Sequence, residues 1–360
     1  MKRSVTFALL FAPALFVYAC SSDKTEDPPP NDNTPEGGPG TPDSPKPNDD
    51  AGTDSPTDPD SSNPNTNPIM GIGTPTAVAI FNGLYTEGPV WRGDSLYVAE
   101  YKSPGGVLIK HVPPAANTVF RNVVTATDLP LGTTFDEKTN TFVTCEVTGG
   151  GVSGGSLIRT TLAGVATPIA LTFDAGGNVF DSPNDVVARK SDGTLYVTDP
   201  GYQGAPAINH IWRITPTGAV FEIALAGRPN GIALSPDDKT LYVSFTDPQV
   251  LPPEILKYPV NTDGSLGPSA LFAKLPPVDS AADGVAVDSN GNVYAAVKDG
   301  VEVFKSDGTK WGKITTPKGI NGLAFGGADK KTLYMTANGS DPVGSAGVYQ
   351  VVVKVPGLAQ

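Results

Sequence analysis

Short apolar runs separated by polar turn residues recur from residue 69 to the end of the chain. The runs are rich in β-branched and aromatic residues, and clusters of Gly, Pro, Asn and Asp lie between them. No long stretch places apolar residues at the 3.6-residue spacing of a helix, whereas short runs bounded by turn residues are typical of strands. The pattern therefore predicts an all-β domain over residues 69–360.

The runs belong to a repeat with two parts. Its second part is an aromatic residue between apolar neighbours, found at Tyr97, Phe142, Tyr196, Tyr242, Tyr294 and Tyr334. Its first part lies 10 to 13 residues earlier, at Glu87-Gly88, Leu131-Gly132, Asn184-Asp185, Asn230-Gly231, Asp283-Gly284 and Asn321-Gly322. Six copies at about 49 residues each suit one four-stranded sheet per copy, which predicts a six-bladed β-propeller. A β-sandwich or two smaller β domains are the alternatives.

A propeller must also join its two ends. The strand expected at Thr76–Phe81 precedes the first repeat, and the strand expected within Val348–Val355 follows the last one. We expect these two strands to share a blade, because pairing them closes the ring and removes an open sheet edge.

The N-terminus reads as an export signal covering residues 1–19. Lys2 and Arg3 precede the apolar stretch Val5–Ala19, which is too short for the roughly 20 residues of a spanning helix. The stretch ends at Cys20 followed by Ser21, and this junction resembles the lipobox of bacterial lipoproteins. The resemblance implies lipidation of Cys20, a membrane anchor and sorting to the outer membrane. An ordinary signal peptide with an incidental cysteine is the alternative.

Residues 20–68 have the composition of a disordered tether. Between residues 21 and 68 lie 12 Pro and 11 Asp or Glu among 48 residues, with almost no apolar side chain. Such a segment cannot bury enough apolar surface to offset its conformational entropy. The sequence therefore predicts three parts, a signal peptide over 1–19, a lipidated tether over 20–68 and a propeller over 69–360.

Charge and composition exclude several classes of function. The chain carries 25 Lys and Arg against 37 Asp and Glu, with no basic cluster beyond the N-terminus, so nucleic acid is not an expected partner. Two cysteines cannot form a disulfide framework, and His111 and His210 lie in unrelated contexts, which disfavours a multi-histidine metal centre. We expect a monomer, with Cys145 as a buried apolar side chain.

The residues that open the repeats carry the candidate chemistry. Equivalent positions in a propeller converge on its axis, and five of the six openings hold an oxygen donor, at Glu87, Asn184, Asn230, Asp283 and Asn321. Two carboxylates and several amide oxygens suit Ca²⁺, Mg²⁺ or Mn²⁺. The alternative is that Asn and Asp before Gly are only turn formers, although this does not explain the glutamate.

These segments resemble the SMP-30/gluconolactonase/LRE-like family, above all its bacterial gluconolactonases. The resemblance is carried by Glu87–Trp91, Phe180–Val187, Asp199–Tyr202, Arg228–Ala233, Asp283–Val285 and Asn321–Gly327. It implies a six-bladed propeller with one divalent cation, Ca²⁺ first and Zn²⁺, Mg²⁺ or Mn²⁺ otherwise. It implies Glu87, Asn230 and Asp283 as metal ligands, Asn184 as a metal or substrate contact, and Asp283 as the acid/base. Ser182 and Asn321 are further expected substrate contacts.

The resemblance implies hydrolysis of a sugar lactone or another small lactone. The cation would polarise the carbonyl group while a carboxylate removes a proton from water. A surface propeller that binds a ligand without catalysis is the alternative from another class. An ester or organophosphate hydrolase ranks lower, because neither histidine lies at a repeat opening.

One segment departs from the family pattern. Thr144–Val147 lacks the histidine that bacterial gluconolactonases usually carry after Cys-Glu, and the glycine-rich stretch Gly149–Gly155 follows in place of a basic pair. We therefore expect a different lactone or a loss of catalysis. The same stretch matches G-x-S-x-G and G-x-G-x-x-G by chance, because no strand-to-helix turn is expected there.

Overall fold

The computed structural model describes most of the chain beyond residue 62. The described ranges are 63–80, 85–101, 105–148, 154–173, 180–201, 209–225, 227–246, 253–276, 282–337 and 347–358. The expected signal peptide, Cys20 and most of the expected tether lie outside these ranges. The chain divides into two units, 1–55 and 56–360, and all described residues belong to the second.

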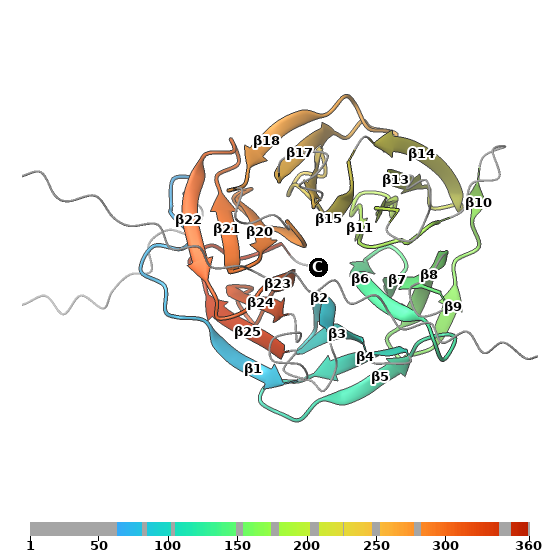
Figure 1. Ribbon diagram of the computed structural model, residues 1–360, viewed down its shortest axis with the longest axis horizontal. Coiled ribbons are helices and arrows are strands. Elements are labelled where there is room, and N and C mark those ends of the chain that lie inside the picture. The colour runs from blue at the N-terminus through green and yellow to red at the C-terminus, as the bar shows by residue number, and fades with distance from the viewer. Residues whose placement is uncertain are drawn as a thin grey trace, which may run out of the picture. The chain divides into compact units, whose positions relative to one another are not determined.

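Six antiparallel sheets surround a central axis in this second unit (Figure 1). Five are built from strands that follow one another along the chain. The first three are β2 (Tyr85–Arg92), β3 (Ser95–Tyr101), β4 (Gly106–His111) and β5 (Thr118–Asn122); β6 (Leu129–Asp136), β7 (Thr141–Val147), β8 (Gly155–Thr161) and β9 (Ala166–Pro168); β11 (Val186–Ala188), β12 (Leu195–Asp199), β13 (Asn209–Ile214) and β14 (Ala219–Leu225) with the short parallel β10 (Thr172–Phe173). The next two are β15 (Pro229–Leu234), β16 (Thr240–Phe245), β17 (Glu254–Pro259) and β18 (Ala270–Lys274); β19 (Val285–Val287), β20 (Val293–Val297), β21 (Gly300–Phe304) and β22 (Lys310–Thr315).

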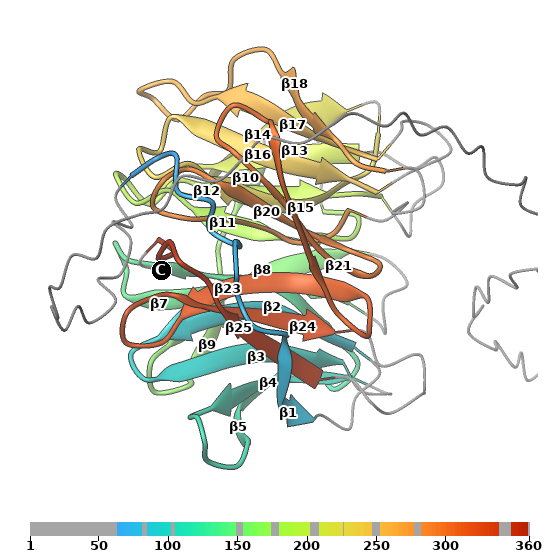
Figure 2. The ribbon, with the colours of Figure 1, turned by 90° about the vertical axis from the view of Figure 1, so that its left-hand side faces the viewer.

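The sixth sheet joins the two ends of the propeller. It consists of β23 (Ile320–Gly326), β24 (Thr332–Ala337), β25 (Gly347–Val352) and β1 (Thr76–Ile80). The first strand pairs antiparallel with β25, with Thr76 opposite Gln350 (Figure 2). The expected closure is confirmed, with the last strand ending at Val352. The six-bladed all-β architecture is likewise confirmed, and no helix long and apolar enough to cross a membrane occurs in the described part of the chain.

The repeated aromatic residues lie on the second strand of each blade and fill the spaces between sheets. All six are buried, and each lies in an apolar cluster that joins two neighbouring blades. Tyr97 lies 4.4 Å from Phe142, and Tyr334 stacks on Trp91 at 5.2 Å between ring centroids. Burying such a side chain contributes roughly 1.5–3 kcal/mol, so each repeat is stabilised only when its neighbours are present. Cys145 lies in one of these inter-blade cores, as expected.

Asn63 and Pro68, which precede the expected start of the domain, contact the propeller. The Asn63 carbonyl accepts a hydrogen bond from Asn290 Nδ2 (3.1 Å), and the Pro68 carbonyl accepts one from the Lys354 amide (3.0 Å). Asn290 belongs to the turn between β19 and β20, at the end of the inner strand opposite Asp283. The described N-terminal segment therefore lies at the face opposite the repeat openings.

Candidate active site on the propeller axis

Glycines let the inner strands of neighbouring blades touch around the axis. The Gly284 amide donates to the Asn321 carbonyl (2.7 Å), and the Gly132 amide donates to the Asn184 carbonyl (2.8 Å). A Cβ atom on Gly284 would lie only 2.7 Å from that Asn321 oxygen, which real side chains do not tolerate. The second residue of the repeat opening is therefore glycine because backbone meets backbone there.

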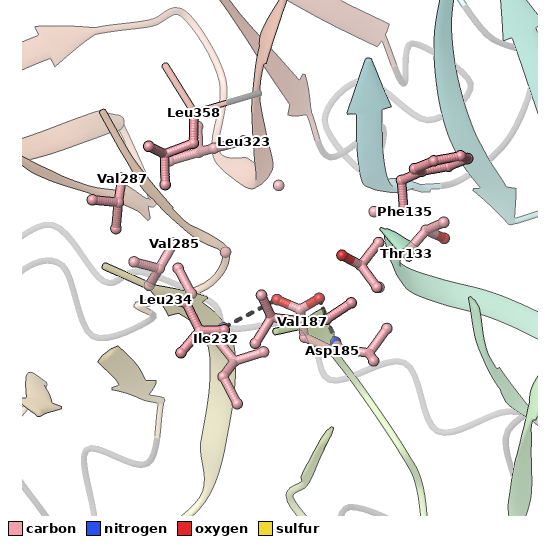
Figure 3. Close-up of a pocket in the computed structure, with 18 of the residues that line it drawn as sticks. Thr133, Phe135, Asp185, Val187, Ile232, Leu234, Val285, Val287, Leu323 and Leu358 are labelled. Atoms are coloured by element: carbon pink, nitrogen blue, oxygen red, sulfur yellow. Dashed lines mark hydrogen bonds between the residues drawn. The ribbon is translucent and has the colours of Figure 1, made fainter. Parts of the chain in front are cut away.

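The close approach of the inner strands brings most of the predicted site residues to one axial cavity. Glu87, Asn184, Asp283 and Asn321 line the same cavity, although they come from four different blades. Asp185 lines it as well, and Figure 3 shows its carboxylate among side chains from several blades. The repeat openings do converge on the axis, as the pattern predicts.

Three carboxyl groups in this cavity influence one another. Burial, then the charges of Asp283 and Asp185, raises the pKa of Glu87 well above its ordinary value. Burial, then the Asp185 charge, raises the pKa of Asp283 to about 8, against hydrogen bonds from Asn230 and the Gly284 amide. Burial raises the pKa of Asp185 to about 7. None of the main influences on these pKa values is a lysine or arginine. Arg189 and Lys190 line the same cavity, but no described lysine or arginine forms an ion pair with the three carboxyl groups.

Asn230 is not among the residues that line the cavity, but it hydrogen-bonds to Asp283. Its Nδ2 donates to Thr246 Oγ1 (2.8 Å), and its Oδ1 is buried without a hydrogen-bond partner. A buried oxygen without a partner is costly, and a cation would satisfy it. Two carboxylates and an amide oxygen are hard donors, so Glu87, Asp283 and Asn230 fit a divalent cation. No group of three His, Cys, Asp or Glu side chains that could hold a metal occurs in the described ranges. The expected ligand set therefore needs the Asn230 amide oxygen as well as the two carboxylates.

Asp185 is the site residue that the repeat pattern did not select. Its Oδ1 accepts the Val186 amide (2.8 Å), and its Oδ2 accepts the Ile232 amide (3.1 Å) on the next blade (Figure 3). Five of the six openings have glycine at this position, and only the third has a side chain there. That exception was the available signal, and the structure shows that it adds a third carboxylate to the cavity.

The two remaining predicted contacts lie in different surroundings. Asn321 lines the cavity, and its Nδ2 donates to the Thr86 carbonyl (3.2 Å) of the first blade. Ser182 is buried outside the cavity lining, and its amide donates to Asp199 Oδ1 (2.7 Å). The substrate roles of both residues stay predictions. Within the stretch Gly149–Gly155 that departs from the family pattern, residues 149–153 lie outside the described residues.

Part of the cavity wall is apolar. Ile232, Leu234, Val285, Val287 and Leu323 line it, and Leu358 from the C-terminal segment lies beside them (Figure 3). That segment is held by a hydrogen bond from the Ser289 amide to the Pro356 carbonyl (2.8 Å). Charged side chains line the same cavity, at Glu137, Arg189, Lys190 and Asp238.

The histidines lie away from this cavity. His210 Nε2 is 2.8 Å from Glu222 Oε1, and His111 Nδ1 is 2.9 Å from Asn117 Oδ1. Neither histidine is among the cavity-lining residues, as the sequence predicts. The site chemistry therefore rests on carboxyl and amide groups.

The fold and site together define a six-bladed propeller with an acidic axial pocket. Residues 85–339 match the SMP-30/gluconolactonase/LRE-like region, which covers more than half of the chain. The chain belongs to this family.

Known proteins of the same architecture agree with this assignment. A gluconolactonase of Zymomonas mobilis is 27% identical over 308 residues, covering 75% of this chain and 81% of that protein. The structure of a gluconolactonase from Xanthomonas campestris superposes with a TM-score of 0.63 at 24% identity, covering 79% of this chain and 95% of that one. A calcium-binding protein, regucalcin, from Agrobacterium tumefaciens superposes with a TM-score of 0.61 at 20% identity, covering 79% and 96%. At these identities the two structures establish the shared fold.

Proposed function

We propose that this protein is a lactonase that opens sugar lactones at the axial carboxylate site. The observation that carries the proposal is the cluster of Glu87, Asp185 and Asp283 beside the unpartnered Asn230 oxygen. Family membership and the gluconolactonase relative support an enzyme of this class over a propeller that only binds a ligand. A sugar lactone is the favoured substrate because polar amides line the cavity next to the carboxylates.

Each residue of the site has its own role in lactone hydrolysis. A divalent cation held by Glu87, Asn230 and Asp283 would supply Lewis-acid polarisation of the lactone carbonyl. Asp283 accepts a proton from the attacking water and returns a proton to the ring oxygen when the ester bond breaks, giving the hydroxy acid. Asn230 donates to Asp283 and holds its carboxylate in place. Asn184 and Asn321 orient the substrate hydroxyls, because an amide both donates and accepts.

Proton release on a panel of lactones tests this proposal. We expect the purified protein to open glucono-δ-lactone in the presence of Ca²⁺, Mg²⁺, Mn²⁺ or Zn²⁺, and to lose turnover in chelator. The chelated protein should stay folded by circular dichroism, which separates loss of chemistry from loss of structure. A folded, cation-binding protein without turnover on any lactone would instead support a binding propeller.

Cation binding should also stabilise the fold. Because the cation site brings the carboxylates together only in the folded state, calcium at 100 times its Kd should add about 2.7 kcal/mol to the free energy of unfolding. Calorimetry with and without Ca²⁺ measures the shift in Tm. The Asn230→Ala variant is the control, since it removes the unpartnered oxygen. A shift as large in that variant as in the wild-type protein would contradict the assigned ligand set.

A further inference from the structure

A buried carboxylate holds the segment that leads into the third blade. Residues 180–184 precede β11, which with three residues is among the shortest inner strands. Asp199 ends the neighbouring strand β12 and is fully buried, with 0% of its surface exposed. Its Oδ1 accepts the Ser182 amide (2.7 Å), and its Oδ2 accepts the Asp181 amide (2.9 Å) and Trp212 Nε1 (3.0 Å).

The carboxylate joins three separate parts of the blade. Asp199 belongs to β12, Trp212 belongs to β13, and the two amides belong to the segment before β11. Trp212 also meets Phe180, at the start of that segment, in an edge-to-face contact of 5.9 Å. The segment is thus fixed by side-chain interactions over residues where no strand ladder holds it.

Burying the Asp199 carboxylate without a cationic partner costs desolvation free energy. No lysine or arginine of the described residues pairs with Asp199, and burial is the main influence on its pKa, which is raised. Three donated N–H groups offset part of this desolvation cost, whereas an apolar contact would carry none of it. A group retained at such a cost is a candidate for a role beyond stability.

The segment ends at a residue that faces the axial cavity. Asn184 follows Ser182 by two positions, with the buried Pro183 between them. The Asn184 amide donates to the Thr198 carbonyl (2.8 Å), one residue before Asp199, and its carbonyl accepts the Gly132 amide of the second blade (2.8 Å). Asp199 therefore fixes the residues that lead to Asn184, while backbone hydrogen bonds hold Asn184 itself.

We propose that Asp199 is a positioning residue, which fixes residues 180–184 so that the Asn184 side chain meets the hydroxyl groups of a sugar lactone. The inference rests on the proposed lactonase function. Asp199 lies behind the segment and does not touch the reacting atoms. Its loss should weaken recognition of sugar hydroxyls and leave the chemistry at the lactone carbonyl largely intact.

The Asp199→Asn variant tests this, with Asp288→Asn as its matched control. The side-chain nitrogen of Asn cannot accept a hydrogen bond, so at least one of the N–H groups that donate to Asp199 loses its acceptor. Asp288 is equally buried and accepts from Asn290, Asn292 and Tyr294, but it lies at the opposite end of the inner strand that begins beside Asp283. Both variants lose a buried carboxylate, and only one should affect Asn184.

The readout compares a lactone that has hydroxyls with one that has none. For Asp199→Asn, KM for glucono-δ-lactone should rise about tenfold, equivalent to about 1.4 kcal/mol, the scale of a hydrogen bond to the substrate. The kcat/KM for δ-valerolactone should stay within about twofold, and Asp288→Asn should change neither substrate by more than that. The indole N–H signal of Trp212 should shift in the ¹H–¹⁵N spectrum of Asp199→Asn alone.

Three results would overturn the inference. They are wild-type kinetics in Asp199→Asn, equal losses on both lactones, and equal losses in the two variants. If the wild-type protein opens neither lactone, the proposed function fails, and calorimetric binding of gluconate to the calcium-loaded protein replaces KM. Weaker gluconate binding in Asp199→Asn alone would then support the positioning role. Unchanged binding in that variant, or no binding by the wild-type protein, would reject it.

Discussion

The Asp283→Ala variant is expected to lose at least about 10³-fold in kcat/KM for lactone hydrolysis. Removing an acid/base group alone costs 10²- to 10⁴-fold, and this change also deletes a cation ligand. Its fold should survive, because Asp283 is a partly buried carboxylate whose pKa is raised to about 8 by burial and by Asp185. In chelator the variant should therefore be at least as stable as the wild-type protein. Proton-release kinetics and urea unfolding measure the two effects.

Asp288→Ala is the comparison for this experiment. It removes a carboxylate that is fully buried, whose pKa burial raises to about 6, at the far end of β19. We expect it to lower stability, since Asn292 and Tyr294 lose their acceptor, and to leave kcat/KM within a few-fold of wild type. Turnover at the wild-type rate in Asp283→Ala would show that the axial cluster is not the active site.

The Gly231→Ala variant is expected to lose more than about 2 kcal/mol of unfolding free energy and to lose calcium binding. An added Cβ would meet the Asp283 carbonyl, the Gly284 Cα at 2.6 Å and the Val285 amide at 2.7 Å. All three are backbone atoms, so no side chain can rotate away, and overpacking of this kind typically costs 1–3 kcal/mol or more. The shift would also separate Asn230 from Asp283. Urea unfolding and calcium titration measure both effects.

Gly73→Ala provides the control for this substitution. A Cβ at Gly73 would meet no atom within 4 Å, and the position lies on the N-terminal segment before β1. We expect its stability to stay within about 0.5 kcal/mol of wild type. If Gly231→Ala were as stable as Gly73→Ala, the close backbone contact between the fourth and fifth blades would be wrong.

Most of the fold was predictable because the propeller is periodic. An aromatic residue such as Tyr196 recurs wherever a second strand must fill the gap to the next sheet, and that requirement repeats once per blade. The closure by β1 was predictable for the same reason, since an unpaired last blade would expose a strand edge. The contacts of Asn63 and Pro68 with the propeller were less predictable, because their carbonyls also accept hydrogen bonds from residues far away in the sequence, Asn290 and Lys354.

The candidate site was predictable only in part. Glu87, Asn230 and Asp283 stand out in the repeat, because each is an oxygen donor at a position where a strand usually has an apolar or β-branched residue. Asp185 and Asp199 do not stand out as oxygen donors at an opening, since one occupies a glycine position and the other ends a second strand. Their roles depend on partners from other strands or blades, such as the Ile232 and Ser182 amides.

The sequence by itself determined the number of blades, the order of the strands and the residues that open each inner strand. These features follow from local burial and turn chemistry, which recur at a regular spacing along the chain. Only the tertiary structure decided that three carboxylates share one cavity, that the Asn230 oxygen lacks a partner, and that the Ser182 amide bonds to Asp199. The physical reason is that desolvation and charge interactions depend on distances between blades, and no spacing along the chain encodes those distances.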